Sequence, residues 1–344
     1  MIGIDISDRS MKIIQLSDGK EKRLLAHCWA NLPDKTMENG VVLQPKIVQQ
    51  KLREALQQCR IPGDINDAVV VSIPETQSFL RVIEIPNMAE DEVNEAVQWE
   101  VAQHIPFGLE NVYIDWQNLV GKGHVAVGGK REVQVGAAQK KVVDQLYTTL
   151  SAVGLDLAAF ELESQALVRA LISSELANRQ GLLIIDLGAS ATNVVIHDHG
   201  AMRFTATLQK GVSNLTQASG LTNEDKEQVN TKLHELDQTA RERLAAQLLP
   251  SMEELVIEVR GIVEFYNSID SQHEVKEIIL TGGGSNMPGL DKAFHKYFDN
   301  VHVQRGNPWV NVLSGSRIAR PPMDVKDSVR YTTALGLALR QVVV

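Results

Sequence analysis

The sequence predicts an α/β protein with two lobes that face each other across a cleft, and three observations lead to this expectation. At 344 residues, the chain is longer than one ordinary hydrophobic core. Strand-like and helix-like patterns alternate along it. Two similar patterns, GIDISDRSMKII at 3–14 and IIDLGASATNVV at 184–195, recur far apart in the chain, as expected for two lobes of related fold.

The first lobe is expected over residues 1–76. Later segments, at about 158–180 and 328–344, should complete it. Its core elements alternate between period-two strand patterns and one amphipathic helix pattern. We expect them in the order strand, strand, strand, helix, strand, at residues 2–6, 11–16, 23–32, 46–59 and 68–74.

The middle and the last third of the chain differ in their predicted secondary structure. Residues 77–157 combine strand patterns with an acidic helix and are interpreted as an inserted α+β subdomain. Residues 181–327 form the expected second lobe, in which about 212–274 is a mainly helical subdomain.

Composition narrows the class of partner. The chain is 44% hydrophobic and has a formal net charge of −9, with its lysines and arginines scattered along the sequence. Nucleic acid and anionic lipid are therefore not expected as direct partners. A nucleotide remains compatible, because backbone N–H groups and one lysine are enough to hold phosphates.

The cysteines and the apolar runs indicate a cellular setting. Cys28 and Cys59 match no metal or redox spacing and suggest no disulfide framework, which favours a reducing, cytosolic compartment. The chain enters a strand pattern at once, and no stretch reaches the roughly 20 apolar residues of a membrane span. We expect a cytosolic protein that reaches a membrane only through a partner.

The two hairpin patterns carry the candidate chemistry. Each has an apolar strand, an aspartate, a turn of small residues and a second strand, so that Asp5 corresponds to Asp186 and Ser7 to Gly188. Either hairpin alone could be ordinary turn chemistry. Together they predict backbone N–H groups for phosphate and carboxylates for Mg²⁺. The later strand and glycine turn EIILTGGG, which ends at Gly284, would add a close backbone approach.

These three stretches, in this order, resemble the two phosphate motifs and the adenosine motif of the actin-like ATPase superfamily. The resemblance narrows further. VIEIPNMAEDEVNEAVQWEVAQHIPFGLENVYIDWQ, NPWVNV and the terminal GLALR look like the PilM family of type IV pilus assembly proteins, which are related to the division protein FtsA. A generic nucleotide site does not require the stretch HIPFGLENVYIDWQ, so this stretch is the most informative one for the resemblance to the PilM family.

The resemblance implies an actin-like fold with an FtsA-type inserted subdomain, which matches the insertion at 77–157. It also implies ATP with Mg²⁺ between the lobes. Proteins of this family are cytoplasmic adaptors that bind the N-terminal cytoplasmic tail of the inner-membrane protein PilN. The tail is expected in a groove that involves the inserted subdomain.

Family positions carry over to this sequence residue by residue. Asp5 and Asp186 would hold Mg²⁺ through water. The predicted nucleotide contacts come from both hairpins, a later glycine and the glycine turn: Ser7, Ser10, Lys12, Gly188, Ala189, Thr192, Gly211, Gly282, Gly283 and Gly284. The helix that usually contacts adenine is represented by Glu227 and Lys232, and Val212 replaces the second glycine of a family pair.

Catalysis and assembly are left open by the sequence. Glu161 and Glu163 lie where the superfamily connects its lobes near the terminal phosphate, and either could orient water. ATP could be slowly hydrolysed or only bound. The alternatives are an FtsA-like filament or division protein and a superfamily kinase or phosphatase. Pilus motor ATPases are further candidate partners, and self-association is compatible with the family.

Overall fold

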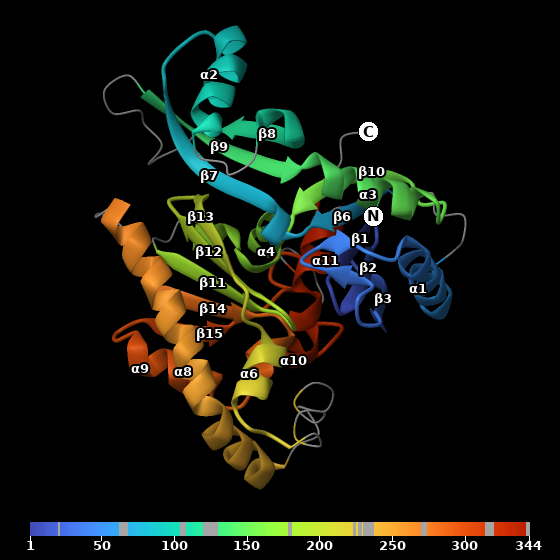
Figure 1. Ribbon diagram of the computed structural model, residues 1–344, viewed down its shortest axis with the longest axis vertical. Coiled ribbons are helices and arrows are strands. Elements are labelled where there is room, and N and C mark those ends of the chain that lie inside the picture. Colours follow the sequence, from blue (N-terminus) through green and yellow to red (C-terminus); the bar gives the residue numbers. More distant parts are fainter. Residues whose placement is uncertain are drawn as a thin grey trace.

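The computed structural model describes residues 1–19, 21–61, 68–103, 108–119, 130–177, 181–222, 225, 229, 237–269, 274–313 and 320–341. Two large sheets organise the molecule (Figure 1). The strands β4 (Met37–Glu38) and β5 (Val41–Val42) form a third, two-stranded sheet, and both belong to the chain segment of the first lobe.

The first large sheet has five strands, with β1 central in the sheet, parallel to β6 and antiparallel to β2. The order across the sheet is β10 (Leu157–Leu162), β6 (Val69–Ile73), β1 (Ile2–Ile6), β2 (Ser10–Leu16) and β3 (Leu24–Asn31). One face packs on α1 (Pro45–Gln58) and α3 (Lys140–Ser151). The other packs on α4 (Glu163–Leu171) and α11 (Thr332–Ala338).

The second large sheet has eight strands. Their order is β15 (His302–Arg305), β14 (Glu277–Thr281), β11 (Leu182–Leu187), β12 (Thr192–Asp198), β13 (Ala201–Leu208), β7 (Ser78–Pro86), β9 (Lys130–Gln139) and β8 (Val112–Asn118). The helices of its largest core cluster are α6 (Val212–Ala218), α8 (Gln238–Ile269) and α9 (Leu290–Tyr297). Helix α2 (Glu90–Ala102) covers β7, β8 and β9.

Short elements complete the description. They are the helices α5 (Ser174–Ala177) and α10 (Val325–Ser328) and the 3-10 turns η1 (Glu75–Gln77), η2 (Leu109–Asn111), η3 (Gly283–Asn286) and η4 (Val329–Tyr331). The predicted strands and the helix of the first lobe are confirmed to within two residues at each end. Apolar residues recurring every three or four positions explain α1, which buries Val48, Leu52, Ala55 and Leu56.

The strands of the insertion are continuous with those of the second lobe. β13 pairs with β7, where Phe204 lies opposite Arg81. The Gln134 side chain donates a hydrogen bond to the Met202 carbonyl over 3.0 Å, and Arg203 forms an ion pair with Glu132. The inserted strands are thus attached to the second lobe. Helix α3, although it lies within the predicted 77–157 segment, packs into the core of the first sheet.

The structure corrects the expectation for the cysteines. Cys28 on β3 and Cys59 at the end of α1 are joined by a disulfide, with their Cα atoms 5.8 Å apart. Their spacing in the sequence gave no sign of this, because the packing of α1 on β3 alone brings them together.

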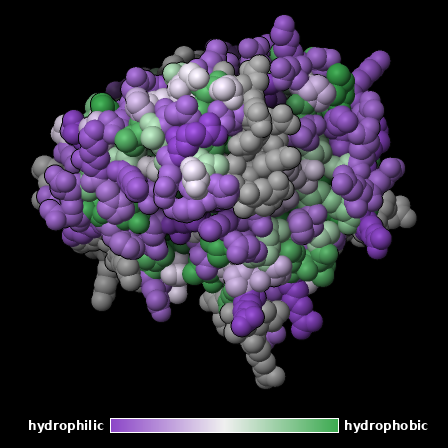
Figure 2. Space-filling view, turned by 90° about the horizontal axis from the view of Figure 1, so that it is seen from below, coloured by the Kyte–Doolittle hydropathy of each residue, from purple (hydrophilic) through white to green (hydrophobic). Residues whose placement is uncertain are grey.

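The surface is that of a protein with a well-buried interior. On the face seen in Figure 2 hydrophilic residues predominate, and hydrophobic ones occur in small groups. Within the described ranges, no helix is both long enough and apolar enough to cross a membrane.

Helix α11 lies very close to α4, and one glycine makes this possible. A Cβ atom added at Gly336 would lie 1.9 Å from the Ala166 carbonyl oxygen. By contrast, a Cβ at Gly261, in the middle of α8, would have no neighbour within 4 Å.

We therefore expect Gly336→Ala to lower the free energy of unfolding by about 1–3 kcal/mol, because the backbones must separate. The matched control Gly261→Ala should raise it by about 0.5–1 kcal/mol, the usual gain of alanine over glycine inside a helix. Urea denaturation followed by circular dichroism measures both. Equal stability of Gly336→Ala and the unaltered chain would contradict the close packing.

Candidate functional site

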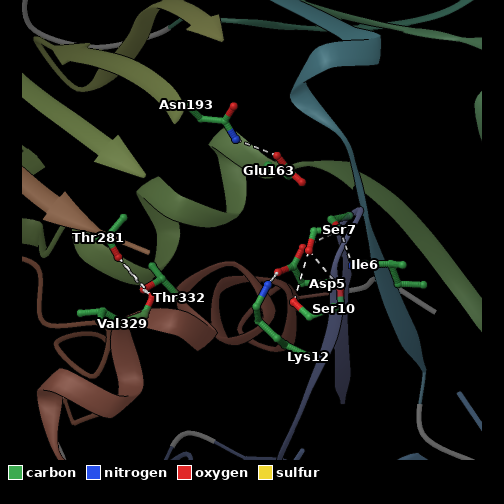
Figure 3. Close-up of polar contacts among 11 residues, drawn as sticks. Asp5, Ile6, Ser7, Ser10, Lys12, Glu163, Asn193, Thr281, Val329 and Thr332 are labelled. Atoms are coloured by element: carbon green, nitrogen blue, oxygen red, sulfur yellow. Dashed lines mark hydrogen bonds and ion pairs between the residues drawn. The ribbon is translucent and has the colours of Figure 1, made fainter. Parts of the chain in front are cut away.

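The first wall of the site is the β1–β2 hairpin. In the ladder Asp5 lies opposite Lys12, so both side chains leave the same face of the sheet. Lys12 Nζ donates to Asp5 Oδ2 over 2.9 Å, and Ser72 Oγ donates to Asp5 Oδ1 over 3.2 Å. The turn itself is closed by Ser7, whose backbone N–H donates to the Ser10 carbonyl over 2.9 Å (Figure 3).

The second wall is the β11–β12 hairpin. Asp186 lies opposite Asn193 in this ladder, and the Gly188 N–H closes the turn onto the Ala191 carbonyl over 2.9 Å. The two hairpin turns contact each other, since Ser190 Oγ donates to Asp8 Oδ2 over 3.4 Å. The two similar hairpins of the sequence therefore lie face to face.

The glycine turn after β14 closes one end of the site. Gly282 has a φ of +79°, and a Cβ there would lie 2.3 Å from Asp186 Oδ1. Gly284 packs on the side chain of Leu187, where a Cβ would be 2.4 Å from Cγ, whereas Gly283 has open space. Thr281 is tied to the opposite lobe by a 2.7 Å hydroxyl contact with Thr332 (Figure 3).

These three parts enclose a cavity of about 370 Å³ between the lobes. Most of the predicted nucleotide contacts line it, together with both aspartates and one of the two candidate glutamates. The predicted residues in its lining are Asp5, Ser7, Ser10, Lys12, Glu163, Asp186, Gly188, Ala189, Gly282, Gly283 and Gly284.

Two predicted contacts lie elsewhere. Thr192 is fully buried, and its hydroxyl donates to the Lys210 carbonyl over 2.6 Å. Because neighbouring residues of a strand point to opposite faces, Asn193 rather than Thr192 faces the cavity. Gly211 supports the second hairpin from behind, since a Cβ there would lie 2.6 Å from the backbone of Ala189.

The two candidate glutamates lie in different cavities. Glu163, in the first turn of α4, lines the cavity and accepts a hydrogen bond from Asn193 Nδ2 over 2.8 Å (Figure 3). Glu161 instead forms ion pairs with Arg169 and Arg340 in a second cavity. The strand ends between them, and the change of backbone direction turns them to different sides.

Sequence reasoning missed several residues of the cavity. Asp8, Ser190 and Asn193 line it but were not singled out, although all three lie within the two hairpin patterns. Asn193 lies directly opposite Asp186 in the ladder, so its side chain leaves the same face of the sheet. Pairing the two strands of the hairpin pattern would therefore have identified it. Glu227 and Lys232, the predicted adenine contacts, lie outside the described residues.

The cavity holds more carboxylates than cations near the hairpins. Burial and the neighbouring Asp5 raise the pKa of Asp186 to about 6. Burial, Asp5, Glu75 and Asp186 together raise the pKa of Glu163 well above its usual value. Burial lowers the pKa of Lys12, but Asp5 more than offsets this, so that the lysine is charged. A divalent cation bound here would relieve the repulsion between the carboxylates.

The second cavity, of about 910 Å³, lies on the side of the inserted sheet away from α2. Strand β8, strand β9 and strand β10 line it, together with α4 and the residues after α11. Its walls are partly apolar, with Val143, Phe160, Val168, Met202 and Leu339. Arg169 Nη1 donates to Glu161 Oε2 over 2.9 Å, so the charged residues in its lining include an ion pair between a half-buried arginine and a buried glutamate.

The raised pKa of Asp186 predicts a pH dependence of stability. Because the pKa of Asp186 is higher in the folded chain, at about 6, than in the unfolded chain, protonation of this carboxyl stabilises the folded state. This contribution to the free energy of unfolding is fully present below the unfolded pKa and is lost as pH rises through 6. In metal-free buffer at pH 8, Asp186→Asn should therefore have a higher melting temperature than the unaltered chain, and its free energy of unfolding should be larger by about 1–3 kcal/mol. The difference should shrink towards pH 4.

Differential scanning fluorimetry between pH 4 and pH 8 measures this difference. Asn in place of the exposed Asp299 is the matched control and should leave the pH profile unchanged. A constant difference between Asp186→Asn and the unaltered chain across this range would refute the raised pKa.

Comparison with known proteins places this geometry in a family. Residues 3–342 match the family model described as type IV pilus assembly protein PilM. A solved structure titled PilM-PilN type IV pilus biogenesis complex has 25% identity and a TM-score of 0.78, covering 98% of this chain and 97% of that chain. The ethanolamine utilization protein EutJ from Carboxydothermus hydrogenoformans has 14% identity and a TM-score of 0.58, covering 98% and 88%.

The similarity to EutJ concerns the fold alone, which is the actin-like ATPase fold predicted from the three motifs. The family match spans almost every described element, including both hairpins, the insertion and the glycine turn. The chain belongs to the PilM family of type IV pilus assembly proteins.

Proposed function

We propose that this chain is an actin-like adaptor of the type IV pilus assembly machine, which binds ATP in the cleft and the N-terminal tail of a PilN-like inner-membrane protein in a separate groove. One observation carries the proposal: the likeness to the chain of the PilM-PilN complex extends over nearly the full length of both chains. The adaptor would work on the cytoplasmic side of the inner membrane, attached through this partner.

The second cavity is the proposed peptide groove. Its apolar walls suit the side chains of a short extended or helical segment, and its volume of about 910 Å³ suits several residues. Glu161 is almost completely buried and is held by Arg169 and Arg340. This ion-pair cluster would fix the position of the residues after α11, and it offers polar groups to the peptide backbone.

The first cavity is the proposed nucleotide site. The Ser7 and Gly188 turns offer small residues and backbone N–H groups at the meeting point of the lobes, and Lys12 supplies a point charge for phosphate oxygens. Mg²⁺ would be held by Asp5 and Asp186, through water, and would neutralise phosphate charge when bound. Two carboxylates are a fitting donor set, since Mg²⁺ usually takes one or two and keeps several waters.

Glu163 decides between binding and turnover. Its carboxyl faces the cavity at the start of α4, where it could orient water towards a terminal phosphate. Burial and the neighbouring carboxylates raise its pKa well above the usual value. We propose that nucleotide-dependent binding, rather than turnover, is the output of the site.

Binding of ATP with Mg²⁺ should raise the melting temperature of the unaltered chain, because the ligand stabilises only the folded state. Asp186→Asn should abolish most of this shift, since one Mg²⁺-holding carboxylate is lost. Ile257→Asp, an exposed change on α8, is the control and should keep the shift. An undiminished shift in Asp186→Asn would argue against the role of the aspartate pair.

The groove predicts a separate effect on the partner. A synthetic peptide of the PilN-like tail should bind by calorimetry with micromolar affinity. Val168→Asp places a carboxylate in the apolar wall and should weaken binding at least about tenfold, as expected when an unpaired charge is buried. Ile257→Asp makes a similar change outside the groove and should bind normally. If the unaltered chain fails to bind at high micromolar peptide with ATP present, the adaptor proposal fails.

A further inference from the structure

Four side chains form a patch where the inserted sheet meets the second lobe, and we call it the aromatic patch: Phe79, Arg81, Phe204 and Phe265. The Arg81 guanidinium carbon lies 5.3 Å from the ring centroid of Phe79 and 5.6 Å from that of Phe204. Near the end of α8, the ring centroid of Phe265 lies 6.0 Å from that of Phe204. The two phenylalanine rings beside Arg81 hold its guanidinium in place.

Strand alternation places the aromatic patch on the face of the inserted sheet that α2 covers. Along β7, Phe79 and Arg81 point to the same side as Ile83 and Ile85, which are buried beneath α2. Leu80 points to the opposite side, into a cluster that includes residues of the second cavity. The aromatic patch and the proposed peptide groove therefore lie on opposite faces of one sheet, so that both can be occupied at once.

Arg81 has no anionic partner in the described part of the chain. Its side chain is half-buried, and no carboxylate among the described residues lies within 4.0 Å of its guanidinium nitrogens. By contrast, Arg203 on the neighbouring strand forms an ion pair with Glu132. A guanidinium presents several N–H donors in a planar fork that matches a carboxylate. The donors of Arg81 are thus available to a carboxylate from another molecule.

The aromatic patch combines this charge with apolar surface. The Phe265 side chain is 51% exposed, and Phe79 and Phe204 are half-buried. Aromatic residues and arginine are the residues enriched in the centres of protein interfaces, and adjoining apolar surface marks an interaction site. A ligand that matches the patch therefore needs a carboxylate with apolar groups beside it.

Charge separates the possible occupants. A two-fold contact between copies of this chain, centred on the patch, would bring two Arg81 guanidinium groups together, and like charges repel. An anionic membrane surface is held by clusters of several lysines and arginines, whereas the patch contains one cation in a chain of net charge −9. An acidic peptide segment with apolar neighbours supplies both features that the patch needs.

We propose that the aromatic patch binds a short acidic segment of a second partner protein. A carboxylate of this segment pairs with Arg81, and the apolar side chains beside it cover Phe79, Phe204 and Phe265. The inference goes beyond the proposed adaptor function, because it adds a second protein on the face of the inserted sheet opposite the groove.

The test selects binders of the full chain from a phage-displayed library of random linear peptides, with the PilN-like tail peptide added in excess to fill the groove. A parallel selection on Arg81→Glu identifies binders of all other surfaces. Peptides enriched only on the unaltered chain are then synthesised and measured by calorimetry. We expect them to share an aspartate or glutamate flanked by apolar residues, and to bind with the tail peptide present or absent.

Variants of the patch assign the contacts. Arg81→Ala should weaken binding of the selected peptides at least about tenfold, and Arg81→Lys should weaken it less, because lysine keeps the charge but lacks the planar fork. Phe265→Ser should weaken it about three- to tenfold through lost apolar contact. Arg260→Ala is the matched control. Arg260 also lies against a ring, that of Tyr297, but already pairs with Glu264, so its loss should leave binding unchanged.

Three results would overturn the inference. The first is a selection in which no peptide is enriched on the unaltered chain over Arg81→Glu. The second is a set of enriched peptides without acidic residues, or acidic peptides that bind a folded Arg81→Ala as tightly as the unaltered chain. The third is self-association of the unaltered chain in sedimentation velocity that Phe265→Ser abolishes, since a second copy would then cover the patch. Melting curves establish that each variant is folded.

Discussion

Strand register in two hairpins is the constraint on which the cleft depends. The β1–β2 ladder places Asp5 opposite Lys12, and the β11–β12 ladder places Asp186 opposite Asn193. A slip of one residue in either ladder would turn these side chains to the other face and leave the cavity without its carboxylates. Because both hairpins are flanked by buried apolar strands, the hydrophobic core holds the register and, through it, the chemistry.

Close backbone approach then fixes the elements that surround each wall. Gly282 lets the turn after β14 approach Asp186, and Gly336 lets α11 approach α4, whose first residue is Glu163. The carboxylates are thus held near one another against their mutual repulsion, as the raised pKa values of Asp186 and Glu163 indicate. The repulsion between these carboxylates lowers stability in this region, and a bound cation would relieve it.

The architecture and the outline of the cleft could be predicted from the sequence, since alternating periodicity, two aspartate turns and a glycine turn all depend on local patterns. Side-chain direction was harder to predict. Thr192 and Asn193 are adjacent, and only the ladder tells which one faces the cavity. Glu161 and Glu163 separate because a strand ends between them. The pairing of β13 with β7 and the Cys28–Cys59 disulfide depend on tertiary packing that no local pattern encodes.

The central claim is that the two aspartates and the two hairpin turns form one metal-dependent nucleotide site. A crystal structure of the chain with Mn²⁺ and a non-hydrolysable ATP analogue tests this most directly, because manganese scatters anomalously and occupies sites of hard oxygen ligands. The account predicts one anomalous peak between Asp5 and Asp186, with the triphosphate against the Ser7 and Gly188 turns. A triphosphate bound away from these turns, or manganese away from both aspartates, would contradict it.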